Sequence, residues 1–265
     1  MSLTKRYLNA CEDILEVVQK QEVLIKEVAE RFSESILKGR VVHLFGSGHS
    51  RIMIEEMWPR YGSYPGFNPI VELSLTFHNQ VTGSNGQRQA MFLENVSGFA
   101  ERVLRNFNIS EEDTALVVSS SGCNIVPVEI AEGFKKRGVW VAGLVSLNHC
   151  EGSKSKRSDG KKLTDFSDAI LDTGAPLGDS MIKVDNLETP VAPGSTVGGC
   201  IIVNSLKAEI AKLLTEAGKP PKVLTSGAII GDKKATDLFE EAYDEHSSRM
   251  AKLYSGLEKK NQSIG

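Results

Sequence analysis

The chain has 265 residues, of which 40% are hydrophobic and 25% charged, and this composition is typical of a globular protein with one large domain or two small ones. A net charge of -3 and an aromatic content of 6% provide neither a basic patch nor stacking platforms, so we expect no nucleic-acid partner. No stretch approaches the ~20 apolar residues of a transmembrane helix, so we expect no membrane span.

The first predicted element is a helix over residues 3–37. Ile14, Val17, Leu24 and Phe32 recur at helical spacing, and acids and lysines fill the opposite face. A helix of this length carries more apolar surface than its own domain needs. We therefore expect it to contact a partner subunit in a homodimer or homotetramer, together with a second long helix predicted over residues 233–262.

Short apolar strands alternate with amphipathic helices between these two ends of the chain. Residues 59–69 are rich in Gly, Pro, Tyr and Asn and are predicted to form a loop. Continuous apolar strands that alternate with helices indicate an α/β fold with a parallel sheet covered on both faces. We expect one domain over residues 1–265, with an N-terminal helix over 1–38 and a core over 41–214. The strands are predicted over residues 40–45, 114–118, 139–145, 169–171 and 181–184, and the other main helices over 93–107, 124–137 and 195–217.

The cysteines and the N-terminal segment bear on the cellular compartment. Acids occupy the N-terminal segment where a signal peptide needs an apolar run. The cysteines have neither CxxC nor zinc-ligand spacing, so we expect free thiols in a reducing, cytoplasmic compartment and neither a metal nor a cofactor. They are Cys11, Cys123, Cys150 and Cys200.

Polar side chains follow the second of the long apolar strands at the point where a helix begins. The segment VVSSSGCNIVP places Ser119, Ser120, Ser121 and Asn124 there. Open α/β sheets bind ligands outside the carboxyl ends of their strands, where helix N-termini offer free N–H groups and a partial positive charge. We predict that these four side chains surround one anionic group. The alternative is that Ser121 or Asn124 only caps the helix.

Two further junctions between elements have the same character. The segment GSGHS, after the first strand, supplies Ser47 and Ser50, and PGSTVGG supplies Ser195 and Thr196 at the start of another helix. These junctions favour a ligand site over a simple cap. No GxxxxGK[ST] loop occurs, and GSGHSR lacks the third glycine of the dinucleotide fingerprint, so the motifs do not indicate a nucleotide.

The segments VVHLFGSGHS and ALVVSSSGCNIVPVEIAEGFKKRGVWVAGLVS resemble the sugar isomerase (SIS) domain, over roughly residues 41–214. The resemblance implies a flavodoxin-like three-layer sandwich with five parallel strands, a phosphorylated sugar as ligand, and dimers or larger oligomers. It implies that the three serines and Asn124 hold the phosphate and that Ser47 and Ser50 face the sugar or the phosphate. The general resemblance is to single-domain phosphosugar-binding and phosphoheptose isomerase-like proteins.

Aldose–ketose isomerisation moves a proton between neighbouring carbons through an enediol, and it needs a base near the carbon and an acid near the oxygens. Glu56 is the first candidate base, because it lies on the helix after GSGHS, and Glu94 is the second. His49 and His78 are further candidates for proton transfer. Each has a plain structural alternative, since helix glutamates commonly face solvent and loop histidines commonly bond the backbone.

Two other functions remain open from the sequence. An etherase that removes a lactyl group from a sugar phosphate needs a similar pair of carboxylates, so the two glutamates do not discriminate it from an isomerase. A non-catalytic sugar-phosphate sensor needs no base. A transcriptional sensor would carry a DNA-binding domain before the sugar domain, whereas the segment before the first strand is predicted to be one helix.

Overall fold

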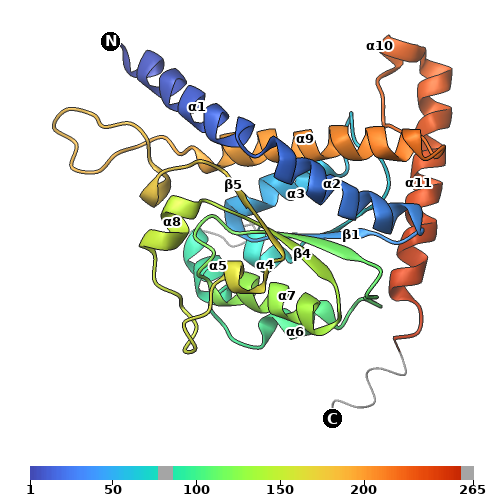
Figure 1. Ribbon diagram of the computed structural model, residues 1–265, viewed down its shortest axis with the longest axis horizontal. Coiled ribbons are helices and arrows are strands. Elements are labelled where there is room, and N and C mark those ends of the chain that lie inside the picture. Colours follow the sequence, from blue (N-terminus) through green and yellow to red (C-terminus); the bar gives the residue numbers. More distant parts are fainter. Residues whose placement is uncertain (77–85, 258–265) are drawn as a thin grey trace.

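Five parallel strands form one sheet in the computed structural model, which describes residues 1–76 and 86–257 (Figure 1). Their order across the sheet is β2-β1-β3-β4-β5, and every neighbouring pair is parallel. The predicted α/β class with a five-stranded parallel sheet is therefore confirmed. The strands are β1 (Val42–Gly46), β2 (Phe67–Ile70), β3 (Thr114–Val118), β4 (Trp140–Val145) and β5 (Ala169–Asp172).

Alternating positions of the central strands face two separate hydrophobic cores. Leu44 and Leu116 belong to one core, whereas their neighbours Phe45 and Val117 belong to the other. Every residue of β1 and β3 is buried, which explains why these segments are mostly apolar instead of alternating with polar residues.

Helices cover both faces of the sheet (Figure 1). In this view α1, α2, α3 and α9 lie above the sheet, α4 to α8 lie below it, and α11 runs along one side. None of the described helices is long and apolar enough to cross a membrane. The α-helices are α1 (Leu3–Gln19), α2 (Glu22–Leu37), α3 (Arg51–Met57), α4 (Leu73–Thr76), α5 (Gln87–Leu93), α6 (Phe99–Leu104), α7 (Ile125–Lys136), α8 (Leu147–Gly152), α9 (Ser195–Glu216), α10 (Gly227–Ile230) and α11 (Asp232–Tyr254), and short 3-10 helices include η1 (Gly48–Ser50), η3 (Leu163–Phe166) and η4 (Leu177–Asp179).

The N-terminal segment forms two helices, α1 and α2, rather than the single helix that its spacing predicts. The break lies at Gln21, which has φ −98° and ψ 10°. The Gln21 side chain pairs with the backbone of Asp172 at the end of β5, accepting from its N–H and donating to its carbonyl, both at 2.8 Å. This pair holds the chain against the sheet at the point where the helix is interrupted.

Three other predicted elements differ from the structure. β2 begins inside the segment that composition predicts to be a loop, and residues 181–184 form no strand but a single antiparallel bridge between Ile182 and Val191. The helix predicted over residues 93–107 is broken at Gly98, whose φ of 82° is left-handed and incompatible with a continuous helix. The C-terminal helix is α11, and the part of the prediction beyond residue 257 lies outside the described residues.

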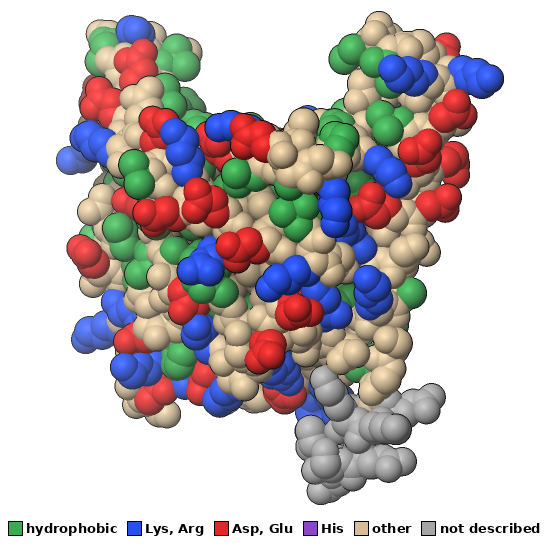
Figure 2. Space-filling view, turned by 45° about the vertical axis from the view of Figure 1, so that its right-hand side comes forward, with side chains coloured by type: hydrophobic (Ala, Val, Ile, Leu, Met, Phe, Trp, Pro, Cys, Tyr) green, Lys and Arg blue, Asp and Glu red, His purple; other side chains and the backbone are tan. Residues whose placement is uncertain are grey.

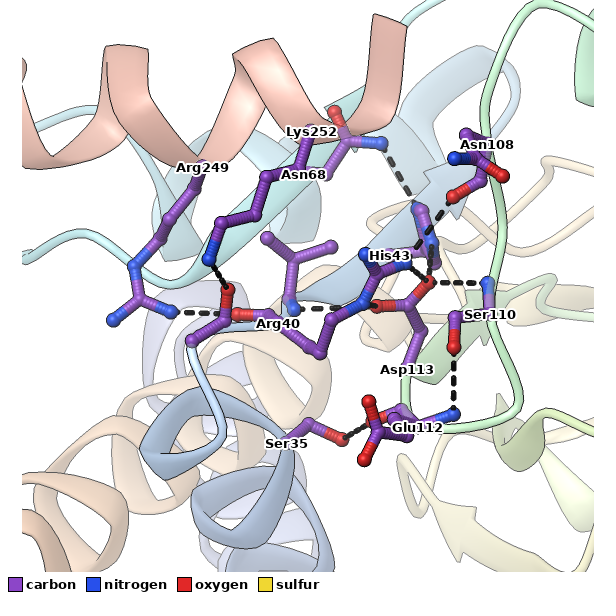
Figure 3. A network of polar contacts seen from close by, with 12 residues as sticks. Ser35, Arg40, His43, Asn68, Asn108, Ser110, Glu112, Asp113, Arg249 and Lys252 are labelled. Carbon is purple, nitrogen blue, oxygen red and sulfur yellow. Dashed lines mark hydrogen bonds and ion pairs between the residues drawn. The ribbon is translucent and has the colours of Figure 1, made fainter. Parts of the chain in front are cut away.

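A buried polar network lies at the amino ends of the strands (Figure 3). The Asp113 carboxylate accepts two hydrogen bonds from the Arg40 guanidinium, at 2.9 and 2.7 Å, and one from the Ser110 amide at 2.8 Å. His43 lies between Asp113, 3.2 Å from its Nε2, and the Asn68 side chain, 2.9 Å from its Nδ1. Burial alone would raise the pKa of Asp113, but hydrogen bonds from His43 and Arg40 hold it below its ordinary value.

The C-terminal helix α11 is fastened to the same corner of the molecule (Figure 3). The Arg249 guanidinium donates to the carbonyls of Ile36 and Arg40, at 3.1 and 2.6 Å, and the Lys252 ammonium donates to the Gly39 carbonyl at 3.2 Å. The last carbonyls of a helix have no partners within that helix. The cations of α11 therefore complete the end of α2 and link the two termini of the chain.

Candidate functional site

A cavity of about 270 Å³ lies at the carboxyl ends of the strands, the end opposite to Asp113. It lies beside β1 and β3. The strand order reverses between these two strands, because β2 lies on one side of β1 and β3 lies on the other. Open α/β sheets bind ligands at this switch point. The wall is formed by the turns after β1 and β3, by α5 and α8, and by the start of α9.

The turn after β1 brings Ser47, His49 and Ser50 to the cavity. Its tight geometry depends on Gly46, where a Cβ atom would lie 2.7 Å from the Ser50 carbonyl oxygen. Ser47 is nearly buried, and its hydroxyl donates to Glu94 Oε2 at 2.8 Å. The structure thus places the three residues of this predicted junction at one wall of the cavity.

Hydrogen bonds to the end of β4 and to the residue after it fix the backbone of the loop after β3, residues 119–124. The Ser119 amide donates to the Leu144 carbonyl at 3.0 Å, and the Ser120 carbonyl accepts from the Ser146 amide at 2.9 Å. The turn closes through a bond from the Gly122 amide to the Ser119 carbonyl at 3.0 Å, with Gly122 at a left-handed φ of 61°. We call this segment the serine loop; it is a preformed part of the cavity.

Several hydrogen-bond donors of the serine loop have no acceptor within the chain. The Ser120 hydroxyl oxygen is buried and has no partner in the described structure. Likewise, the following amides have no acceptor among the residues that the structure describes: those of Ser120, Ser121, Asn124 and Ile125. Buried or partly buried polar groups without partners are uncommon in folded proteins and call for an explanation. An anion at the start of α7 would satisfy these donors and would also meet the positive end of the helix dipole.

The capping alternative for this loop is only partly met. Asn124 occupies the N-cap position of α7, yet its side chain makes no capping bond and instead donates to Glu94 Oε1 at 2.8 Å. Ser121 accepts from the Cys123 amide at 3.3 Å in a local turn, which leaves its hydroxyl hydrogen available to a ligand. Capping therefore accounts for neither Asn124 nor the unpartnered amides.

Glu94 is the carboxylate at the centre of these contacts. It follows α5, lines the cavity, and accepts one hydrogen bond on each oxygen, from Ser47 and from Asn124. Its own carbonyl accepts from the Val126 amide of α7 at 2.8 Å, so the backbone is fixed as well as the side chain. Burial raises the pKa of Glu94, and the two hydrogen bonds only partly oppose this effect. A positioned carboxylate with a raised pKa is suited to proton transfer.

The start of α9 forms the wall that contains Ser195 and Thr196. Asp179 occupies this helix terminus: its carboxylate accepts from the amides of Gly194 and Ser195, at 3.0 and 2.8 Å, and from the Ser195 hydroxyl at 2.5 Å. Gly198 allows the helix to approach the sheet closely, because a Cβ at this position would lie 1.9 Å from the Thr173 carbonyl oxygen. Ser195 thus lies at the cavity as predicted, but its hydroxyl is bonded to Asp179.

One of the predicted catalytic residues lies away from the cavity, and another is outside the described residues. Glu56 does not line it in the described structure; its carboxylate pairs with Arg60 and accepts from Asn204 of α9 at 2.9 Å. In the described structure Glu56 thus contacts Arg60 and α9 and does not line the cavity. His78 lies outside the described residues, so its position is not stated.

The sequence patterns missed two residues that line the cavity, His149 and Asp179. His149 lies in α8 directly after β4, and its buried Nδ1 has no partner among the described residues. The rule that selected the serines, polar residues after a buried strand, would also have selected His149. Asp179 had no such signal, because it reaches α9 from a long connection. No group of three or more potential metal ligands occurs among the described residues.

Comparison with known proteins shows which family the chain resembles in sequence. A family model described as the SIS domain matches residues 6–146. A UPF0309 protein of Halalkalibacterium halodurans is 33% identical over 246 residues, which cover 92% of this chain and 96% of the relative. A UPF0309 protein of Listeria innocua is 31% identical over 254 residues, which cover 96% of each chain. A solved phosphoheptose isomerase from Francisella tularensis has a TM-score of 0.49 and 16% identity, over 80% of this chain and 100% of that one, a similarity too distant to say what this chain binds.

Proposed function

The chain belongs to the SIS-domain family, and from this premise we propose that it binds a phosphorylated sugar in the cavity and isomerises it between aldose and ketose forms. The observation that carries the proposal is the combination, in one small cavity, of a loop with unpartnered donors and a partly buried carboxylate. The loop suits a phosphate, and the carboxylate suits proton transfer at a neighbouring carbon.

The phosphate is proposed to bind at the serine loop. Neutral hydroxyl and amide donors at the start of the 12-residue helix α7 bind an anion through hydrogen bonds and the helix dipole. The hydroxyls of Ser119, Ser120 and Ser121 and the free amides of the loop supply these donors. Small side chains allow the phosphate oxygens to approach the backbone closely.

Glu94 is proposed to act as the base. It removes the proton from the carbon next to the carbonyl, the C–H electron pair becomes the C=C bond of an enediol, and the carbonyl oxygen takes a proton from an acid. Glu94 then returns the proton to the adjacent carbon while the other hydroxyl loses its proton, so atoms and charge balance. The hydrogen bonds from Ser47 and Asn124 hold the carboxylate in place for both steps.

His149 is proposed as the group that exchanges protons with the sugar oxygens. Its Nδ1 is buried with no partner among the described residues, so a lone pair there costs less than an unbonded N–H. That tautomer puts the proton on Nε2, and His149 lines the cavity. His49, from the turn after β1, lines the cavity too and is the alternative donor.

A thermal-shift screen against pentose, hexose and heptose phosphates tests binding. A ligand at 100 times its Kd adds about 2.7 kcal/mol to the free energy of unfolding. NMR spectra of the stabilising sugar in D2O, with the protein added, then report isomerisation and exchange of the transferred proton for deuterium. Stabilisation by no sugar phosphate contradicts the proposal. Binding without conversion or exchange supports a non-catalytic sensor instead of an isomerase.

We also propose that this single-domain protein acts in the cytoplasm as a homodimer or homotetramer. Leu3, Leu8 and Leu15 of α1 are 47%, 51% and 40% exposed, and α1 projects from the body of the molecule (Figure 1). Figure 2 shows two projections with a hollow between them and charges of both signs over the face below. A second copy would cover the apolar side of α1. Sedimentation as a 28.9 kDa monomer at micromolar concentration would contradict this assembly.

A further inference from the structure

We infer that the cavity accepts a sugar with one anionic group and rejects a sugar that carries a second, such as a bisphosphate or a sugar phosphate with a carboxylate. The inference rests on the proposed function, because it takes the serine loop as the phosphate site. The inference specifies the number of anionic groups on the sugar, a property that membership of the family leaves open.

The two long helices that start at the cavity differ in what occupies their N-termini. The start of α7 has unpartnered amides and no carboxylate bonded to them. The start of α9, which is 22 residues long, is occupied by Asp179, whose carboxylate takes the amides of Gly194 and Ser195 and the Ser195 hydroxyl. The chain's own anion therefore fills the position that a second phosphate or carboxylate would need.

The charges around the cavity point the same way. Among the described residues that line it, the acids are Glu94 and Asp179, and no lysine or arginine is present. Among the described residues that line it, positive potential for a ligand therefore comes from the helix dipoles and not from a cationic Lys or Arg side chain. Once a phosphate occupies the serine loop, a second anion at the start of α9 would face the Asp179 carboxylate, and Glu94 also lines the cavity.

The small volume of the cavity strengthens this repulsion. At about 270 Å³ it holds one small molecule, so a group at the far end of the ligand stays close to Asp179 or Glu94. Like charges within several ångströms at a partly buried site lower affinity by roughly 10- to 100-fold. A hydroxyl group at the same place donates a hydrogen bond to either carboxylate. The cavity thus argues against the etherase alternative, whose lactyl substrate carries a carboxylate as well as a phosphate.

Matched pairs of sugars test the inference by calorimetric titration: glucose 6-phosphate with 6-phosphogluconate, and fructose 6-phosphate with fructose 1,6-bisphosphate. The same comparison applies to N-acetylglucosamine 6-phosphate and its lactyl ether, N-acetylmuramic acid 6-phosphate. We expect the singly anionic member of a binding pair to bind at least about 10-fold more tightly. Equal or tighter binding of the doubly anionic member overturns the inference while leaving the proposed function intact. Failure of every compound to bind contradicts the proposed function itself.

Asp179→Asn separates charge from shape. Asparagine is a good N-cap residue and tolerates the left-handed backbone of Asp179, φ 51°, so the fold should be kept. We expect the ratio of the two dissociation constants in a binding pair to shrink by about 10-fold in this variant. Asp172→Asn is the matched control, because Asp172 also accepts from backbone amides, those of Leu147 and Gly174, but does not line the cavity. A ratio that stays at its parental value in Asp179→Asn, or that shrinks equally in both variants, overturns the inference.

Discussion

Polar side chains gather at both ends of the parallel sheet, and the two ends differ in how many of their hydrogen-bond donors lack an acceptor in the described structure. At the amino ends, Asp113 accepts from Arg40, from Ser110 and from His43, and the other nitrogen of His43 is bonded to Asn68. At the carboxyl ends, the buried Ser120 hydroxyl and four amides of residues 120–125 lack acceptors in the described structure. The contacts around Asp113 are made within the chain, whereas the serine loop and Glu94 line a cavity.

The two carboxylates at these ends also have pKa values shifted in opposite directions. Burial acts on both to raise the pKa, but the cation and the other donors around Asp113 reverse the effect. Glu94 has two neutral donors, which do not reverse it. A carboxylate held in its charged form by a cation stabilises the fold, while a carboxylate whose pKa is raised is suited to exchange protons. The difference separates a structural polar network from a site for chemistry.

The largest effect is expected at the amino end. Asp113→Ala leaves the Arg40 guanidinium and His43 without their acceptor, and breaking such a buried pair costs about 3–5 kcal/mol of stability. Urea denaturation of Asp113→Ala measures this loss, with the exposed Glu111→Ala as control. A loss below about 1 kcal/mol would mean that the network is not structural.

Replacing the proposed base affects turnover instead of folding. Glu94→Gln keeps the shape and the hydrogen bond from Asn124, and the Ser47 hydroxyl can rotate to accept from the new amide group. The side chain cannot accept a proton, so we expect turnover to fall by ~100-fold or more while the Kd for the sugar phosphate changes little. Glu56→Gln is the matched control, since Glu56 pairs with Arg60 away from the cavity. Normal turnover in Glu94→Gln, or equal losses in both variants, would remove Glu94 from the mechanism.

The serine loop is expected to affect ligand affinity more than stability. Each hydrogen bond to a charged group contributes ~1.5–3 kcal/mol, so the double variant Ser119→Ala/Ser121→Ala should bind the sugar phosphate roughly 100-fold more weakly. Its stability should fall by no more than ~1 kcal/mol. Ser35→Ala at the amino end is the control, because the Ser35 hydroxyl donates to the Glu112 carbonyl at 2.7 Å. Ser35→Ala should lose stability and keep its affinity for the sugar phosphate. If the double variant lost stability and Ser35→Ala lost affinity, the ligand would not bind at the serine loop.

The smallest expected effect is on pH dependence. Glu94 must be deprotonated to act as a base, and its pKa is raised, so the acidic limb of kcat/KM should lie above the ordinary glutamate value of ~4.3. The same shift means that the protonated form favours the folded state, and that this contribution is lost as pH rises through the raised pKa. Glu94→Gln should therefore be relatively more stable than the parent at alkaline pH. An acidic limb at or below ~4.3 would contradict the shift.

Four of the five strands and the longer helices were predictable because their signals are local. Buried parallel strands are mostly apolar, and helix starts follow polar junctions such as residues 119–124. The break at Gln21 was not predictable, because it depends on a pair with Asp172, which is distant in sequence and meets Gln21 only in the folded chain. β2 was missed for a related reason: Asn68 and Pro69 resemble a loop locally, but the strand pairs with β1.

The candidate site was predictable only in part. The serines at the ends of β1 and β3 could be selected because parallel strands end at the same edge of the sheet. Choosing between Glu56 and Glu94 required knowing which helix faces the cavity, and that depends on packing between elements. Asp179 reaches the start of α9 from η4, so no spacing along the sequence indicates the pair.

A crystal structure with the most stabilising sugar phosphate from the thermal-shift screen tests most directly whether the serine loop binds the phosphate. We expect phosphate density within hydrogen-bond distance of the serine loop hydroxyls and of the four unpartnered amides between Ser120 and Ile125, with sugar carbons facing Glu94. We expect no ligand at the amino ends of the strands beside Asp113 and His43, because these side chains already bond to each other. A phosphate bound elsewhere, with the serine loop empty, would contradict this expectation.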